Sequence, residues 1–531
     1  ASDDQETLVE LLGNAELGQL SAIAPAIVES SDQVNGVLQD AFDRALGAWL
    51  DFRDSSELLL DETASQNERA SFDARAMDLA RRVGNLGAGL MLRGHTEMVK
   101  VHLELSPNPT IRSYLIQCFI SAEGPADPIV TLFDDGGSSV TAAALQILGS
   151  LPKTSRVPSR VADRCVEIYQ STEDLELHAS AEWFLQKNLL GRRLKGVAPS
   201  PSVGYRTVEG QFMVRLPLVA TAIVGSSSLD RSRMANEKRR TIQVPSGLHF
   251  SRNELTVEQS KVFRKGTRDR QPKPVDKVRN DVATRIGFFE AARYCNWLSE
   301  LEGIPEDQWC YLPNDQGEIS SGMRIAEDHL ERTGYQIPTP DLWEYACRGG
   351  TLTPKPYGYG NELSSEFIRW MGTREVNQQR FAIRRPNGFG LIDMLGNSAE
   401  WSTGMVDRVP GERPPFGGLF SGRGFEDRPG RPPRRPGDGG RPRIERPGER
   451  PGEVGRRPPE PAGRRPGLAF GGGPVLLDAA GAIIRANTSF AILGGAFDSP
   501  AHKVRSSDRS IISPPITNKP VTLRLMRIVA E

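Results

Sequence analysis

The chain has 531 residues, of which 38% are hydrophobic and 25% are charged, with a formal net charge of -1. This length exceeds what a single hydrophobic core usually serves, so we expect a globular protein of two or three domains. The near-zero net charge argues against a global electrostatic attraction to nucleic acid or to an anionic membrane surface.

The five cysteines are spread over the chain and form no CxxC pair. Their odd number and their spacing argue against a dense disulfide framework and against a zinc ribbon, so we interpret them as buried, reduced thiols. Reduced thiols favour the cytoplasm, although the compartment stays open. The cysteines are Cys118, Cys165, Cys295, Cys310 and Cys347.

No apolar run approaches the ~20 residues that span a bilayer, so no membrane segment is expected in this chain. The chain begins at Ala1 and shows no basic and then apolar leader. We therefore interpret it as a processed product or as a piece of a longer protein.

Residues 1–195 carry the apolar periodicity of α-helices. Three helical segments recur at intervals of roughly thirty residues, each preceded by Asn, Asp, Gly or Pro. They begin near Ile111, Val140 and Asp174. This spacing is typical of an α-solenoid of the HEAT kind, in which each repeat buries its apolar face on its neighbours. An ordinary helical bundle is the alternative.

Residues 196–204 combine Pro and Gly without periodicity and are predicted to be a short linker. After Tyr205 Gly and Pro become frequent, the strands are expected to be short, and only two helices are predicted, over 287–301 and 339–347. Thr339 is the expected N-cap of the second helix, because its side chain can accept a hydrogen bond from the first turn.

Residues 408–473 contain five Arg-Pro-Gly triplets and very few aliphatic residues. Between Gly411 and Gly467 there are 14 Arg against 8 acidic residues, so this stretch has a net charge of +6. It cannot bury enough apolar surface to offset the entropy of ordering, and we expect a flexible insertion. Its positive charge suits an acidic partner, whereas the small number of aromatic residues weakens the alternative of nucleic-acid binding. An inert solvated loop is the other alternative.

Several long motifs after residue 205 follow one another in the order found in one known family. Residues 334–350 are close to "R-L-P-T-E-A-E-W-E-Y-A-x-R-G-G", and residues 386–401 match "N-x-F-G-L-x-D-M-x-G-N-V-W-E-W". Residues 205–531 therefore resemble the formylglycine-generating enzyme family, whose members are also called sulfatase-modifying factors. Shorter matches lie at 254–259, 291–298, 493–497 and 504–509.

This resemblance implies that residues 205–531 form an α+β domain with a C-type-lectin-like fold and little regular secondary structure. The chain as a whole is then multidomain, with an all-α domain over 1–195. Residues 298–314 are similar to a branch of the family in large planctomycete-type proteins, where a protein kinase often precedes HEAT-like helices and this domain. The resemblance thus implies a part of a larger bacterial signalling or scaffold protein.

The resemblance also implies where the chemistry of the family would lie. Oxidase members bind copper(I) through two cysteines, and the corresponding positions here fall on or near Ser499 and Val504. Sulfoxide-synthase members bind iron through histidines that include an H-x-x-x-H helix, and no two of the six histidines have that spacing. Neither Ser nor Val replaces a thiolate, so copper is not expected, and the missing histidine pair means that iron is not expected either. The groove candidates that remain are Trp401, Ser499, His502, Arg505, Asp508 and Arg509.

Members of the family hold a structural calcium ion in the loop that corresponds to residues 393–400. Here Asp393 and Glu400 would supply carboxylates, and Gly396 and Ser398 would supply backbone carbonyls. Oxygen ligands from one tight loop suit calcium. The alternative is that the two carboxylates only cap the turn through hydrogen bonds.

The function that this sequence favours is a non-catalytic ligand- or protein-binding module. A protein partner would bind either the concave surface of the helical domain or the groove of the second domain. One alternative is a metal-dependent oxidoreductase of the formylglycine-generating or sulfoxide-synthase type with an altered active site, and another is a structural or surface-assembly protein. Under the binding interpretation, Arg505 and Asp508 form a buried ion pair. The oligomeric state stays open.

Overall fold

The computed structural model describes residues 2–59, 66–152, 154–226, 233–234, 236–266, 281–352, 384–406, 476–512 and 519–529. Ala1–Asp407 and Gly473–Glu531 belong to one compact unit. The Arg/Pro/Gly-rich insertion predicted at 408–473 lies outside the described residues. No helix in the described ranges is long and apolar enough to cross a membrane.

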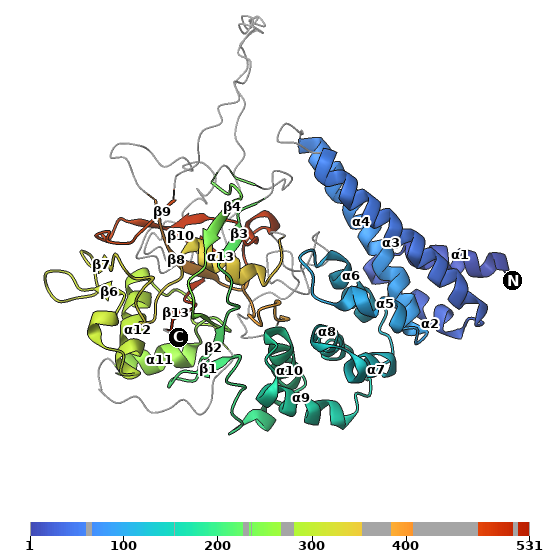
Figure 1. Ribbon diagram of the computed structural model, residues 1–531, viewed down its shortest axis with the longest axis horizontal. Helices are drawn as coiled ribbons and strands as arrows, with labels where there is room; N and C mark the ends of the chain where they lie inside the picture. The colour runs from blue at the N-terminus through green and yellow to red at the C-terminus, as the bar shows by residue number, and fades with distance from the viewer. Residues whose placement is uncertain are drawn as a thin grey trace, which may run out of the picture. The chain divides into compact units, whose positions relative to one another are not determined.

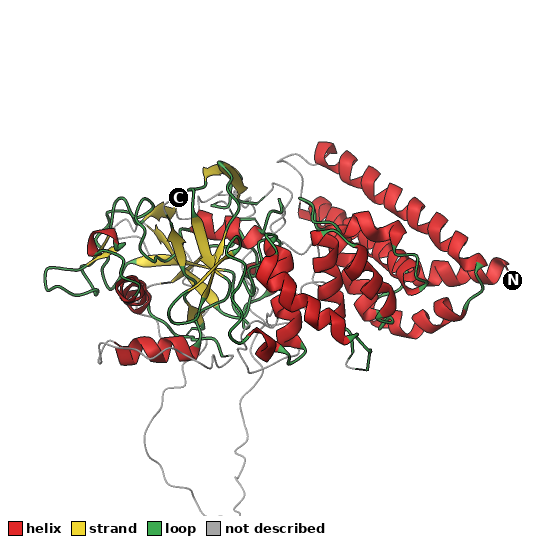
Figure 2. Ribbon diagram, turned by 60° about the horizontal axis from the view of Figure 1, so that its bottom comes forward, coloured by secondary structure: helices red, strands yellow, loops and turns green. Residues whose placement is uncertain are grey.

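The described part of residues 2–194, called the helical part below, contains helices and no strand, as predicted (Figures 1 and 2). Its two longest helices, α3 (Gln33–Leu59) and α4 (Gln66–Leu92), pack against each other. Phe42 and Trp49, which lie seven residues apart on α3, are both buried. The shorter elements around them are α1 (Ser2–Gly13), η1 (Leu17–Gln19), α2 (Leu20–Glu29), α5 (Glu97–Lys100) and η2 (Val101–Leu103).

Three buried helices follow, at the positions of the three predicted helical segments. They are α6 (Thr110–Ser121), α8 (Ser138–Leu148) and α10 (Leu175–Lys187), and α8 packs on both of the others. The amphipathic helices α7 (Asp127–Asp135) and α9 (Ser159–Ser171) pack against α8 and α10 respectively. Consecutive helix pairs, α7–α8 and α9–α10, are compatible with a solenoid, and the assignment to the HEAT kind stays a prediction.

The segment predicted as a linker is packed against the helical part. It follows η3 (Gly191–Leu194), and the backbone N–H of Ser200 donates to the carbonyl of Tyr169 at 2.9 Å. Val203 in the same segment is fully buried. A link of this kind restricts the motion of the two parts relative to each other.

The C-terminal part, from Gly204 onwards, begins with a four-stranded sheet in the order β1-β2-β5-β13 (Figure 1). All of its neighbouring strands are antiparallel. The last strand of the chain therefore pairs with one that lies far earlier in the sequence. The strands are β1 (Gly204–Arg206), β2 (Phe212–Arg215), β5 (Leu248–Ser251) and β13 (Met526–Ile528).

A second sheet has the order β11-β10-β8-β12, with β9 also pairing with β8. Its central strand β10 is buried at every position, which places this sheet inside the core. Its strands are β8 (Ala399–Val406), β9 (Leu476–Asp478), β10 (Ser489–Leu493), β11 (Ser510–Ile512) and β12 (Val521–Thr522). Two short hairpins accompany it, β3 (Thr221–Val224) with β4 (Arg240–Gln243), and β6 (Tyr311–Leu312) with β7 (Arg324–Ile325).

Both helices predicted in this part are present, as α12 (Phe288–Leu301) and α13 (Pro340–Arg348). The side chain of Thr339 accepts a hydrogen bond from the backbone N–H of Leu342 at 3.2 Å, which confirms it as the N-cap of α13. A third helix, α11 (Val257–Gly266), was not predicted. Its sequence is polar overall, and Val257, Val262 and Phe263 are its only apolar residues, too few to predict a helix from their spacing. The 3-10 helices are η4 (Glu306–Gln308) and η5 (Ala501–Lys503).

One hydrophobic core is shared by the helical and the C-terminal parts. It includes Trp183 and Phe184 of α10 together with Phe212, Leu216 and Phe389 of the C-terminal part. A second core lies around α12 and the second sheet. The shared core gives the two parts a common source of stability, because burying apolar surface is the main favourable contribution to folding.

Candidate functional site

The residues predicted to line a catalytic groove serve different structural roles. Trp401 is fully buried, and its Nε1 donates to the carbonyl of Ile286 at 2.8 Å. Ser499 is half-buried, and its Oγ accepts the backbone N–H of Ala496 at 2.9 Å. His502 is exposed. Trp401 is thus a core residue, and Ser499 closes a turn.

Arg505 lies in a buried ion pair, but its main partner is a residue that the sequence analysis did not single out. Its Nη1 and Nη2 donate to the carboxylate of Glu237 at 2.8 and 2.9 Å, whereas Asp508 lies 3.9 Å away. Asp508 instead accepts from Lys503 Nζ at 3.2 Å and from Ser510 Oγ at 2.9 Å. The predicted pair of Arg505 with Asp508 is therefore the weaker contact of Arg505.

Arg509 takes part in a second buried ion pair, with Glu344 of α13. Glu344 also accepts from Arg348 at 2.6 Å and from the backbone N–H of Gly225 at 2.9 Å. Burial pushes the pKa of Glu344 upward, but Arg509 and Arg348 outweigh burial and hold it below its usual value. The carboxylate therefore stays charged and ties α13 to residues 504–509.

Glu400, predicted as a calcium ligand, is fully buried against Arg524. The two side chains approach to 2.8 Å, and Trp343 Nε1 donates to the same carboxylate at 2.6 Å. A calcium ion on this carboxylate would face the positive charge of Arg524. This geometry leaves Glu400 poorly suited to bind calcium and gives it the role of holding Arg524 in the core, while the calcium site itself stays a prediction of the resemblance.

The loop around the other predicted calcium ligands is held by Glu254, which the sequence analysis did not single out. The carboxylate of Glu254 accepts the backbone N–H of Ser398 at 3.1 Å and the side-chain amide of Asn397 at 2.6 Å. Burial, and then the charges of Asp393 and Glu400, raise the pKa of Glu254 well above its usual value. Three buried acidic groups therefore converge on this loop, and the pKa shift of Glu254 favours its neutral form.

The backbone of the same loop turns tightly at Asp393 and Gly396. Asp393 is buried and has a φ of 56°, and Gly396 has a φ of 77°, both in the left-handed region. In the described part of the chain, no group of three or more His, Cys, Asp or Glu side chains is arranged to hold a metal ion. A calcium ion held by Asp393 and by the carbonyls of Gly396 and Ser398 therefore stays a prediction of the resemblance.

All five cysteines are buried, as predicted. Burial raises the pKa of the Cys165 and Cys310 thiols to about 12, and that of Cys347 well above its usual value. A thiol must ionise before it acts as a nucleophile or binds a metal. These cysteines therefore suit packing rather than chemistry.

A polar network joins α10 to the C-terminal part around Arg252. The guanidinium of Arg252 forms an ion pair with Glu182, and its Nη2 lies 2.8 Å from His178 Nδ1. It also lies over the ring of Phe212 at 4.3 Å from the centroid. Arg206 adds a second contact to Glu182 at 3.3 Å. Arg252 is 1% exposed, so the network is shielded from solvent.

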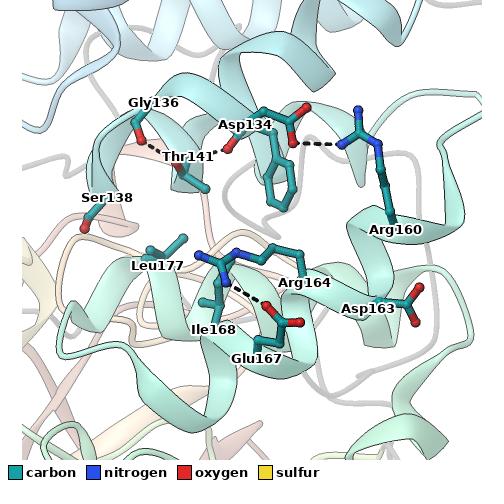
Figure 3. A pocket seen from close by; sticks show the side chains of 11 residues that line it. Asp134, Gly136, Ser138, Thr141, Arg160, Asp163, Arg164, Glu167, Ile168 and Leu177 are labelled. Atoms are coloured by element: carbon teal, nitrogen blue, oxygen red, sulfur yellow. Dashed lines mark hydrogen bonds and ion pairs between the residues drawn. The ribbon is translucent and has the colours of Figure 1, made fainter.

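A concave site lies on the helical part. A pocket of about 510 Å³ is formed where the pair α7–α8 meets the pair α9–α10 (Figure 3). Phe133, Ile168 and Leu177 supply its apolar surface, and Arg160 and Arg164 of α9 are its cations. The sequence analysis predicted a concave binding surface on these helices but named none of these residues.

Comparison with known proteins identifies the family of the C-terminal part. Residues 224–527 match the family model described as a sulfatase-modifying factor enzyme 1-like domain. One relative is a formylglycine-generating enzyme of Mycobacterium tuberculosis, which is 37% identical over 86 residues, or 13% of this chain and 27% of the relative. Another is the chaperone protein LppX of Paenibacillus barcinonensis, 25% identical over 147 residues, or 22% of this chain and 49% of the relative.

The match to these relatives is partial, since the chain spans about a quarter and about half of their lengths. Among solved structures, the variable protein 1 of Treponema denticola is 16% identical to this chain. The superposition has a TM-score of 0.39 and covers 61% of this chain and 98% of the other.

Proposed function

The chain belongs to the sulfatase-modifying factor enzyme 1-like family through residues 224–527, and on this premise we propose that it is a non-catalytic protein-binding module. The module combines the helical part with a member of this family that lacks the residues for oxidation. Its place would be within a larger bacterial signalling or scaffold protein.

The proposal depends mainly on the side chains at the two positions where oxidase members of the family are expected to have cysteines. Ser499 there accepts a backbone hydrogen bond from Ala496, and Val504 is 2% exposed in the core. Copper(I) prefers thiolate ligands, which neither side chain provides. The cysteines of the chain all lie at other positions and are buried.

The other groove candidates support the same proposal. Arg505 and Arg509 are held by the buried carboxylates of Glu237 and Glu344, so their charges already have partners inside the protein. The only hydrogen-bond donor of the Trp401 side chain, Nε1, is used by the backbone carbonyl of Ile286 in the core. A catalytic site requires polar groups that converge on a substrate, and these residues instead stabilise the fold.

Two further observations support binding to proteins. The pocket between the helix pairs contains three large apolar side chains and two arginines, and arginine is enriched at protein interfaces. One relative is named a chaperone protein, and chaperones bind other proteins. Another relative is named a formylglycine-generating enzyme, so names alone also favour the oxidoreductase alternative, and the side chains of Ser499 and Val504 weigh against it.

Oxygen consumption tests the non-catalytic half of the proposal. The protein would be incubated with copper(I), a thiol reductant and a cysteine-containing peptide, and oxygen uptake would be measured against a reaction without protein. We expect no uptake above that background. The same measurement would be made on the double variant S499C/V504C, which places thiols at both positions. Peptide-dependent uptake by the wild-type protein would overturn the proposal.

A further inference from the structure

The pocket on the helical part has an apolar floor. Phe133 of α7, Ile168 of α9 and Leu177 of α10 line it, and they are 5, 6 and 7% exposed. The floor is therefore built by side chains from three helices. An apolar side chain inserted there would bury its own surface together with the exposed edges of these three residues.

The two arginines of the pocket have different partners. Arg160 pairs with Asp134 at 2.8 Å, and this contact joins α9 to α7. Arg164 pairs at 2.6 Å with Glu167, three residues later on its own helix, and each of these two side chains is 61% exposed. A pair of that kind contributes little to stability. Arg164 can therefore exchange Glu167 for a carboxylate of a ligand at small cost.

The position of Arg164 makes that exchange effective. Figure 3 shows its side chain reaching across the pocket toward Leu177. A carboxylate bound to Arg164 would thus lie directly beside the apolar floor. Because the guanidinium offers paired N–H donors, it can bind a carboxylate through two hydrogen bonds.

We propose that this pocket binds a short protein segment in which an aliphatic or aromatic side chain lies next to a carboxylate. The apolar side chain enters between Phe133 and Leu177, and the carboxylate binds Arg164. The carboxylate is either that of an Asp or Glu side chain or that of a chain terminus. This inference rests on the proposed binding function and names the chemistry of its partner.

The charges around the rim restrict the partner further. Asp134, Asp163 and Glu167 line the same pocket as the two arginines. Each of these carboxylates is paired with an arginine: Asp134 with Arg160, Glu167 with Arg164, and Asp163 with Arg193. The rim is therefore close to neutral, and a ligand with many phosphates gains little there, which disfavours nucleic acid. A segment with one carboxylate has to displace only Glu167 from Arg164.

Fluorescence anisotropy with labelled hexapeptides tests the proposal on the full chain. The first probe is capped at both ends and has Leu-Glu at its centre, and two companions replace this with Leu-Gln or Ala-Glu. A fourth peptide is uncapped at its end and finishes in Leu, so that it offers only a terminal carboxylate. We expect the capped Leu-Glu peptide, the terminal Leu peptide or both to bind, and the Leu-Gln and Ala-Glu peptides to bind more weakly.

The variant R164A should weaken the binding of the peptide that binds best by about tenfold or more, since a hydrogen bond to a charged group is lost. R264A is the matched control. Arg264 is an arginine of the C-terminal part that is 59% exposed and pairs with Glu290 at 2.9 Å. Removing it should leave peptide affinity unchanged, and both variants should melt at the wild-type temperature.

Two outcomes would overturn the proposal that this pocket binds the peptide. Equal affinity of the wild-type protein and R164A would show that the peptide binds elsewhere, and the proposed binding function would survive. Absence of binding by all four peptides up to millimolar concentration would also reject this site. Failure of the proposed function is recognised separately, by peptide-dependent oxygen uptake.

Discussion

Arg252 shows how one side chain connects distant segments of this protein. It forms an ion pair with Glu182 of α10, and its backbone carbonyl accepts from Arg524 at 2.8 Å. Arg524 in turn is paired with Glu400. A continuous series of buried polar contacts therefore runs from the helical part to the strand β8.

We predict that R252M lowers the free energy of unfolding by about 3 kcal/mol, because it leaves the buried carboxylate of Glu182 without its main cation. This loss of unfolding free energy should lie at the lower end of the range for broken buried ion pairs, since Arg206 still contacts Glu182 at 3.3 Å. Urea denaturation measures it. R264A, which breaks an exposed pair, should cost at most about 1 kcal/mol. Equal effects of the two variants would contradict this account.

His178 is the titratable group of the same network. Burial, followed by the charges of Arg252 and Arg206, lowers its pKa to about 2. The pKa in the unfolded chain is about 6.5, so the unfolded chain takes up the proton first as the pH falls. The contribution of His178 to stability is complete above pH 6.5 and is lost as the pH falls below that value.

H178N should remove this pH dependence, because Asn keeps an acceptor for Arg252 and does not titrate. Between pH 7.5 and pH 5 the wild-type protein should lose about 2 kcal/mol of unfolding free energy more than H178N does. Chemical denaturation at a series of pH values gives both curves. Parallel curves would mean that His178 takes up a proton in the folded protein.

The predicted calcium ion can be tested at Asp393. Thermal melting of the wild-type protein should occur at a higher temperature with calcium than with a chelator, because a ligand at a hundredfold excess over its Kd adds about 2.7 kcal/mol. D393N should abolish the difference, since it removes the carboxylate that remains in the ligand set. If the wild-type protein melts at the same temperature with calcium and with a chelator, the predicted calcium site in this loop is wrong.

At the scale of elements, residues 384–392 fill the space beside α10. Gly390 has a φ of +72°, and a Cβ placed on it would lie 2.5 Å from the carbonyl oxygen of Leu175 and 3.0 Å from Ala179. Arg385 of the same segment donates to Gln117 of α6 at 3.2 Å. This loop is therefore an interface element as well as the approach to the loop 393–400.

G390A should destabilise the protein by about 2–3 kcal/mol, because the added methyl group meets the backbone of α10 and the φ of this residue disfavours a side chain. G47A is the matched control. A Cβ on Gly47 in α3 meets no atom within 4 Å, so this variant should stabilise the helix by about 0.5–1 kcal/mol. Denaturant titration distinguishes the two. A neutral G390A would show that α10 and this loop separate easily.

For the whole molecule, the shared core predicts cooperative unfolding. Trp183 and Phe184 from the helical part pack in one cluster with Phe212 and Phe389 from the C-terminal part. Differential scanning calorimetry should therefore show one transition in which both parts unfold, with equal calorimetric and van't Hoff enthalpies. Two separate transitions would mean that the interface is weaker than its burial indicates.

Local sequence determined most of the elements. Apolar periodicity predicted the buried helices α6, α8 and α10, and the capping position of Thr339 fixed the start of α13. The polar helix α11 was missed because it has few apolar residues, although one of them, Phe263, is buried in the second core.

The sequence by itself also determined the family of residues 224–527 and the burial of the cysteines, because ordered motifs and spacings are local properties of the chain. Only the tertiary structure decided the partners of the charged residues. Glu237 pairs with Arg505 across 268 positions, and Glu400 pairs with Arg524 across 124. Pairing at such separation depends on strand order and on the cost of leaving a buried charge alone, and neither is visible in a local pattern.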